Sequence, residues 1–223
     1  MELWEAIQSR HSVRQYLPKP LTAEQIEALE DEIDACNRES GLHIQLVTES
    51  PGAFDSRMAH YGKFHGVRNY IAMVGRKGPD LEEKLGWYGE RLVLRAQQLG
   101  LNTCWVALTF SKRKARALVC SDEKLVCVIA IGYGVNHGVP HANKPLEKLC
   151  RVDGPMPDWF RRGMIAARLA PTAVNQQHFR FTLRAPRTVQ AVSTGGFYSK
   201  VDLGIVKYHF AVGAGQDQFD WAP

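Results

Sequence analysis

The sequence lacks the signatures of several common functional classes. It contains no apolar run of about 18 residues, so it predicts no membrane span. Its start, "MELWEAIQSRHSVRQY", carries charges where a signal peptide needs an apolar core, which predicts a cytoplasmic protein. The patterns GxSxG, GxGxxG, HExxH and the Walker A loop do not occur. Function must therefore be sought in less common patterns.

Metal and disulfide signatures are also missing. The five cysteines are odd in number and contain no CxxC pair, which argues against a disulfide framework and a zinc ribbon. The eight histidines form no close cluster with them, so the sequence predicts no metal site.

The chain carries more positive than negative charges. The formal net charge is +5 and the pI is about 9.0, which suits a nucleic acid or a small anionic ligand. The densest basic run, residues 111–116, is by default the solvated face of a helix. At 45% hydrophobic residues, the 223-residue chain can bury a sizeable core in one large or two small domains.

Hydrophobic periodicity predicts a chain of mixed helices and strands. Thr22 and Gln25 have the spacing of a capping box, and Gly100 is expected to end a long helix. Residues 102–108 are expected to be irregular, and 135–157 form a loop-rich connection. We expect helices over 1–12, 20–40, 80–101, 111–120, 157–170 and 196–210, and strands over 43–49, 69–76, 124–134 and 178–185.

The last part of the chain looks like a degraded copy of the first. Residues 26–49 and 160–185 share a helix–loop–strand order, and residues 84–100 parallel 198–213. The identities are few, and such an order also arises by chance, so the repeat remains a hypothesis.

Two short stretches could bind an anion. In "SRHSVR", Arg10 and Arg14 would share a helix face or converge from a helix end near Ser12, and guanidiniums suit phosphate. The alternative is a solvated helix end. In "NKPLEK", Lys144 could contact a phosphate or could simply be exposed.

Two other stretches could line a flat ligand. In "ARLAPTAVNQQHFRF", Pro171 ends a helix, small residues follow, and Asn175 and Gln177 supply amides. An ordinary helix-to-strand turn uses the same residue types. In "LGLNTCWVAL", a bend could present backbone N–H groups, or Trp105 could simply fill the core.

Together these stretches resemble the FMN-dependent nitroreductase family. Arg10, Ser12 and Arg14 match its R-x-S-x-R sequence, and "LGLNTCWVA" matches its L-G-L-x-x-C-W-I-G. Lys144 to Glu147 match its basic-Pro-Leu-Glu sequence. Ala170 to Phe181 match its A-P-S-x-x-N-x-Q-P-W-x-F loop, with Thr172 in place of the serine and "HF" in place of Pro-Trp.

The resemblance implies an α+β, nitroreductase-like fold with a central, mainly antiparallel sheet flanked by helices. The A-P-S loop comes late, however, and the earlier copy, residues 35–41, has no proline. This order resembles nitroreductases built as one chain with two unequal, pseudo-symmetric halves. We therefore expect a monomeric pseudo-dimer, in which 1–150 is a nearly complete half and 151–223 is a trimmed half that supplies the loop.

The resemblance also assigns roles around one FMN. Arg10 and Lys144 would hold the phosphate, assisted by His11 and Ser12, and Arg14 would lie near the pyrimidine end of the flavin. The N–H of Ala107 would point at N5. The residues expected beside or over the ring are Trp105, Val106, Pro171, Thr172, Ala173 and Asn175.

The implied reaction is two-electron transfer from NAD(P)H through FMN to a small acceptor such as a nitroaromatic or a quinone. No metal, nucleic acid or membrane partner is expected. Two alternatives stay open. Ala107-Leu108 replaces the family's Gly-Gly, which would suit a protein that binds FMN without turnover. Alternatively, Lys112 to Arg116 would serve a basic nucleic-acid binder.

Overall fold

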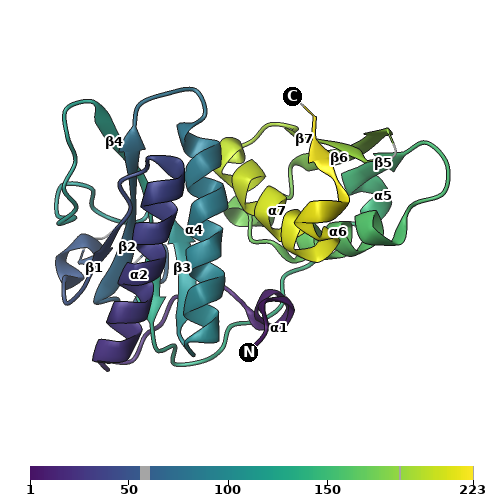
Figure 1. Cartoon of the computed structure of the whole chain (residues 1–223). Helices are drawn as coiled ribbons and strands as arrows, with labels where there is room; N and C mark the ends of the chain where they lie inside the picture. Colours follow the sequence, from purple (N-terminus) through teal and green to yellow (C-terminus); the bar gives the residue numbers. More distant parts are fainter. Residues whose placement is uncertain (56–60, 186, 223) are drawn as a thin grey trace. The chain divides into compact units, whose positions relative to one another are not determined.

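The computed structural model describes residues 1–55, 61–185 and 187–222 of the chain (Figure 1). They form two compact units, each taken by itself below. The N-terminal unit comprises Ser9–Leu81 and Arg91–Pro140, and the C-terminal unit comprises Met1–Gln8, Glu82–Glu90 and His141–Pro223. The predicted division at residue 150 separates two halves that would correspond to fused subunits. It does not refer to compact units of packing, and it stays a prediction.

The N-terminal unit is built on a four-stranded antiparallel sheet in the order β1-β2-β4-β3. Its strands are β1 (Gln45–Val47), β2 (Asn69–Arg76), β3 (Asn102–Val106) and β4 (Glu123–Gly132). Every residue of β2 but the last is buried, as expected for a central strand that is apolar throughout. A short 3-10 helix, η1 (Pro51–Phe54), follows β1.

Helix α2 (Ala23–Ser40) lies beside this sheet (Figure 1). The predicted capping box is confirmed, because the Thr22 hydroxyl accepts from the Gln25 N–H and the Gln25 side chain accepts from the Thr22 N–H. Leu29, Ile33 and Cys36 are buried at helical spacing and form the face that packs inward.

Helix α4 (Leu81–Gln98) contributes its residues 82–90 to the C-terminal unit and the rest to the N-terminal unit. Its C-cap is Leu99, and Gly100 follows at φ +76°, the left-handed conformation that glycine adopts without strain. The predicted glycine stop is therefore confirmed.

The C-terminal unit contains a second four-stranded sheet in the order β5-β6-β7-β8. The central pair, β6 and β7, is antiparallel, and both outer pairs are parallel. Its elements are α5 (Leu146–Leu149), β5 (Cys150–Val152), α6 (Asp158–Leu169), η2 (Ala173–Asn175), β6 (Phe179–Ala185), β7 (Thr188–Ser193), α7 (Ser199–Ala214), η3 (Gln216–Gln218) and β8 (Asp220–Trp221). The short α1 (Leu3–Ser9) opens the chain.

Aromatic side chains fill the core of this second unit. Phe181 of β6 stacks on Phe210 of α7 with ring centroids 4.7 Å apart. Phe160 of α6 meets Phe210 edge-on at 5.4 Å. Offset and edge-on pairs are the favoured aromatic geometries, so one ring of α7 joins the sheet to α6.

The predicted α+β class with helices flanking mainly antiparallel strands is confirmed, although the strands form two sheets. Some local predictions are wrong. Residues 102–106 form β3, because β4 supplies a partner strand, and residues 111–120 form turns and irregular backbone. In that segment the Arg116 N–H donates to the Tyr70 hydroxyl, whereas in a helix it would donate to a main-chain oxygen of the preceding turn. None of the described helices is both long and apolar enough to cross a membrane.

Candidate functional site

In the N-terminal unit, the R-x-S-x-R residues lie on extended backbone. Helix α1 ends at Ser9, and the chain then runs beside β3, where the Val13 N–H donates to the Thr103 oxygen at 3.0 Å. Of the two arrangements expected for Arg10 and Arg14, the shared helix face is therefore wrong, because the helix ends before both residues. In extended backbone, alternate residues point to the same side. Arg10, Ser12 and Arg14 are alternate residues, so their side chains are expected on one side of the segment.

The Cys104 thiol in β3 shows which side these residues face. Cys104 is 3% exposed, and burial raises its pKa. The guanidinium of Arg14, a hydrogen bond from the Ser12 side chain and the guanidinium of Arg10 each oppose that rise in pKa. Ser12 pairs with Thr103 of β3, so the two cations and the hydroxyl all lie close enough to Cys104 to influence its thiol.

These three residues differ in exposure. Arg10 is 4% exposed, whereas Arg14 is exposed and its guanidinium carbon lies 6.0 Å from the centre of the Phe64 ring. Gly138 packs closely against the half-buried His11 and Ser12, because a Cβ at Gly138 would lie 2.7 Å from the His11 Cβ and 3.0 Å from the Ser12 oxygen. The donor set of guanidiniums and hydroxyl suits a phosphate or another compact anion.

The predicted ring-side residues of this unit lie at the end of β3. Trp105 is half-buried and Val106 is buried, and both pair with β4. Ala107 follows as a half-buried residue outside the strand, and the Leu108 side chain is 64% exposed. The chain thus leaves the sheet at Ala107, which is the residue predicted to present its N–H.

In the C-terminal unit, Lys144 supports the loop that contains the predicted ring-side residues. Its ammonium donates to the carbonyl oxygens of Gln176 at 2.7 Å and Gln177 at 3.1 Å. Its backbone N–H donates to the Gln177 side-chain oxygen at 2.9 Å. Lys144 therefore shapes the loop in this structure, and its assignment to a phosphate stays a prediction.

The amides of this loop bind one another. Gln177 is 3% exposed, and its side-chain nitrogen donates to the Ala142 oxygen and to the Asn175 side-chain oxygen, both at 2.9 Å. The Asn175 amide in turn donates to Ala142 at 2.8 Å, and the Thr172 hydroxyl accepts from the Gln177 N–H at 3.0 Å. Asn175 and Thr172 therefore fix the course of the loop that follows Pro171.

The backbone of the loop is strained. Val174, Asn175 and Gln177 have φ values of 45°, 56° and 45°. Asparagine tolerates this region, but a β-branched valine there is unfavourable by about 1–3 kcal/mol. The Val174 side chain is nevertheless 89% exposed, so its own packing does not compensate for that strain.

Asp202 of α7 is the anchor of the loop, and the sequence patterns did not single it out. It is 5% exposed and accepts from the Ala173 N–H with both oxygens, at 3.0 and 3.1 Å, and from the Gln176 amide at 2.6 Å. Burial raises its pKa to about 6, although these two hydrogen bonds and the charge of His178 oppose the rise. A lone acidic residue in the apolar run "VDLGIV" was the available signal.

Asp202 predicts a pH-dependent stability. Its folded pKa of about 6 lies above the ordinary value of 3.8, so folding favours the protonated carboxyl. That contribution, about 3 kcal/mol, is complete below the ordinary pKa and is lost as the pH rises through the folded pKa. Relative to Asp202→Asn, the wild type should therefore lose stability between pH 4 and pH 7.

Urea unfolding at pH 4, 5, 6 and 7 measures this difference. The exposed Asp31→Asn is the control, and its free energy of unfolding should follow that of the wild type at every pH. Parallel curves for the wild type and Asp202→Asn would contradict the assignment.

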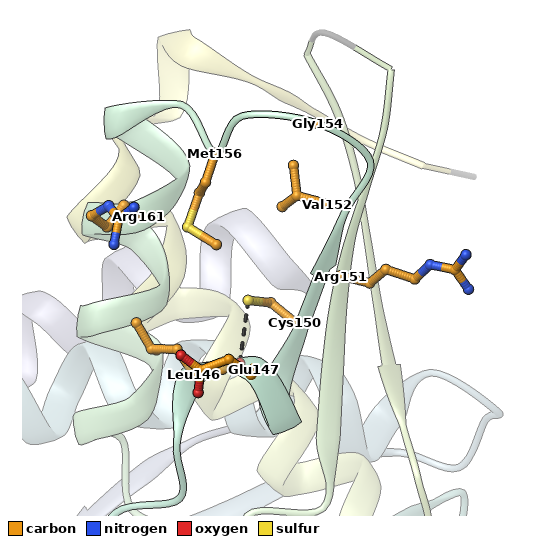
Figure 2. A pocket seen from close by; sticks show the side chains of 8 residues that line it. All are labelled: Leu146, Glu147, Cys150, Arg151, Val152, Gly154, Met156 and Arg161. Atoms are coloured by element: carbon orange, nitrogen blue, oxygen red, sulfur yellow. Dashed lines mark hydrogen bonds between the residues drawn. The ribbon is translucent and has the colours of Figure 1, made fainter.

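The C-terminal unit also contains a cavity of about 410 Å³ between α5, β5 and the start of α6 (Figure 2). The Cys150 thiol and Met156 point toward the same hollow, whereas Arg151 extends away from it. The Cys150 sulfur donates to the Leu146 oxygen at 3.3 Å, and burial raises the pKa of the thiol. No residue predicted to bind FMN lines this cavity.

Comparisons with known proteins agree with this architecture. Residues 2–214 match the family model described as "Putative TM nitroreductase". A "putative nitroreductase" structure from Thermotoga maritima has a TM-score of 0.65 and 21% identity, with 97% of this chain and 85% of that chain covered. No curated protein shows significant similarity to the chain.

Two other solved structures share part of the fold. A "putative nitroreductase in complex with FMN" from Desulfovibrio desulfuricans has a TM-score of 0.55 and 20% identity, covering 70% of this chain and 99% of that one. A "putative NADH dehydrogenase/NAD(P)H nitroreductase" from Parabacteroides distasonis has a TM-score of 0.53 and 20% identity, covering 66% and 95%.

Proposed function

Because the chain belongs to the family described as "Putative TM nitroreductase", we propose that it is an FMN-dependent oxidoreductase. It passes two electrons from NAD(P)H to a small acceptor such as a nitroaromatic or a quinone. The observation that carries this proposal is the pairing of the segment that contains Arg10, Ser12 and Arg14 with β3, beside Cys104. The similar structures of a "putative nitroreductase in complex with FMN" and of a "putative NADH dehydrogenase/NAD(P)H nitroreductase" support the choice of cofactor and reductant.

The residues of the N-terminal unit fit an FMN. When bound, FMN supplies the two-electron chemistry, so the protein needs no acid–base triad of its own. Arg10 and Ser12, with His11, would hold the phosphate, and the positive charge of Arg14 would favour negative charge on the pyrimidine end of the ring. Ala107 offers a backbone N–H where the chain leaves β3.

The C-terminal unit contributes the loop. By the family resemblance, Pro171, Thr172, Ala173 and Asn175 would form a second wall for the ring, and Lys144 would contribute to the phosphate side. Of the three Lys144 ammonium protons, two already have carbonyl acceptors, which leaves one for an anion. We propose one such site per chain, because each of these sequences occurs once.

Reciprocal packing of α4 and α7 supports the pseudo-dimer. A Cβ at Gly86 would overlap the Val201 oxygen, and a Cβ at Gly204 would overlap the Glu83 oxygen. Each glycine thus contacts the residue that lies three positions before the other glycine in the sequence. Such reciprocal contacts are typical of a two-fold interface. The same two helices are aligned in the sequence repeat. We therefore propose that 1–150 and 151–223 correspond to two fused subunits, and that the chain acts as a monomer.

The absorbance spectrum of purified protein tests the function. A flavin spectrum with about one FMN per chain, bleached by anaerobic NADPH or NADH, is expected. Arg14→Gln should weaken FMN binding about 10- to 100-fold, the effect of losing a charged hydrogen bond. The matched control is Arg113→Gln, an equal change of charge at another exposed arginine, which should bind FMN normally. Colourless protein that cannot be loaded with FMN would contradict the proposal.

A protein that binds FMN without turnover is the second candidate. It is favoured by one observation, the exposed Leu108 directly after Ala107, where the side chain could crowd the ring. The two candidates separate in the same experiment, because a flavin that stays oxidised under anaerobic NADPH and NADH supports binding alone. Salt-sensitive retention on DNA, lost in Arg113→Gln, would instead support a nucleic-acid binder.

A further inference from the structure

Phe197 is an exposed aromatic residue that no sequence pattern assigns to the site. It lies between β7 and α7, and its side chain is 73% exposed. Gly195 and Gly196 precede it at φ +104° and +102°, and Tyr198 follows at φ +52°. Three residues with positive φ therefore flank Phe197, two before it and one after it, and they define the shape of the turn.

The Phe197 turn is joined to the strained loop of residues 171–177. The Gln176 amide donates to the Phe197 oxygen at 2.8 Å and to Asp202 at 2.6 Å. Gly196 packs against Gln176 so closely that a Cβ there would overlap the Gln176 side chain and lie 2.8 Å from His178 Nδ1. The Gln176 side chain thus connects the Phe197 turn to the loop of residues 171–177, and it connects both of them to Asp202.

The loop and the Phe197 turn expose apolar side chains to water, which is unfavourable in free energy. Val174 is strained and 89% exposed, Phe197 is 73% exposed, and Asp202 is a buried carboxyl. A turn needed only for connection could carry glycine at position 174 and a polar residue at 197. A ligand with an aromatic body would explain why apolar side chains occupy both places, because its binding would remove them from water.

We propose that Phe197 is a specificity-determining residue that contacts the aromatic ring of the electron acceptor, and that Gln176 and Asp202 position it. This inference rests on the proposed function, since it places the acceptor beside the loop assigned to the flavin. Phe197 selects for aromatic acceptors over small inorganic ones, because only the former offer a ring to pack against.

Full-length, FMN-loaded Phe197→Ala provides the test. The expected result is a KM about 10-fold higher for a nitroaromatic or a quinone, within the range of a lost aromatic contact plus its buried area. The KM for ferricyanide, kcat and the FMN dissociation constant should not change. Phe197→Tyr should restore the wild-type KM, and Leu118→Ala, at another exposed apolar residue, is the control.

A binding measurement makes the test independent of turnover. Calorimetric titration of the oxidised protein with 4-nitrobenzoate should give a dissociation constant about 10-fold higher for Phe197→Ala than for wild type. Equal constants, or a loss of FMN from the variant, would overturn the role of Phe197. A wild type that lacks FMN or turnover, but whose 4-nitrobenzoate binding depends on Phe197, would overturn the proposed function and leave the contact standing.

Gln176→Ala separates positioning from contact. Gln176 is not expected to touch the acceptor, so its removal should raise the aromatic KM less than Phe197→Ala does. In the double variant the two effects should not add, because both act through the same ring. Additive effects would show that Gln176 does not act through Phe197.

Discussion

Gly86→Ala is expected to lower the free energy of unfolding by more than about 3 kcal/mol, the range in which backbone is forced apart. The new Cβ would overlap the Val201 oxygen and lie 3.0 Å from both the Gly204 Cα and the Ile205 nitrogen. These are main-chain atoms, so no side chain can rotate away. The helix-propensity gain of alanine, about 1 kcal/mol, is too small to offset the separation of α4 from α7.

Urea unfolding of full-length protein measures the effect of Gly86→Ala. Gly52→Ala is the matched control, because a Cβ at Gly52 would meet nothing within 4 Å, and its effect should stay within about 0.5 kcal/mol. Gly204→Ala should be as damaging as Gly86→Ala, and the double variant should lose less than the sum, since both changes disrupt one contact. If Gly86→Ala were as stable as Gly52→Ala, the close crossing of the two helices would be refuted.

The elements that the sequence predicted well are those specified by their own residues. The capping box at Thr22 and Gln25 lies within four residues, and β2 is apolar from end to end. Residues 102–106 have no such local signal, and they become β3 because β4 pairs with them. The basic run 111–116 has helical composition, but Tyr70, distant in the sequence, binds its backbone instead.

In the candidate site too, residue types could be predicted locally, whereas their arrangement depends on residues distant in the sequence. Arg10, Ser12 and Arg14 were singled out by residue type, but the sequence left a shared helix face and a helix end both open, and pairing of this segment with β3 decides between them. Asn175 was chosen as an amide for a ligand, but Ala142, 33 residues away, accepts its hydrogen bond. Asp202 was missed because its role depends on a loop that is separated from it in the sequence by two strands, β6 and β7.

A second large effect is expected at the buried pair of Glu90 and His209, which joins α4 to α7. Both side chains are fully buried, and His209 Nε2 lies 2.8 Å from a Glu90 oxygen. His209 Nδ1 lies 3.1 Å from the Ala166 oxygen, which can only accept, so Nδ1 carries a proton.

Glu90→Leu should cost about 3–5 kcal/mol, because it leaves a buried imidazole without its partner. Glu90→Gln should be milder, since its amide can donate to Nε2. The double replacement of Glu90 and His209 by leucine should recover most of the loss, as apolar substitutes for buried pairs often do. The control is Glu83→Leu, which removes the partner of Lys207 from the same two helices at a partly exposed position and should cost at most about 1 kcal/mol. A double-mutant cycle from urea unfolding measures the coupling, and equal losses for Glu90→Leu and Glu83→Leu would contradict a buried pair.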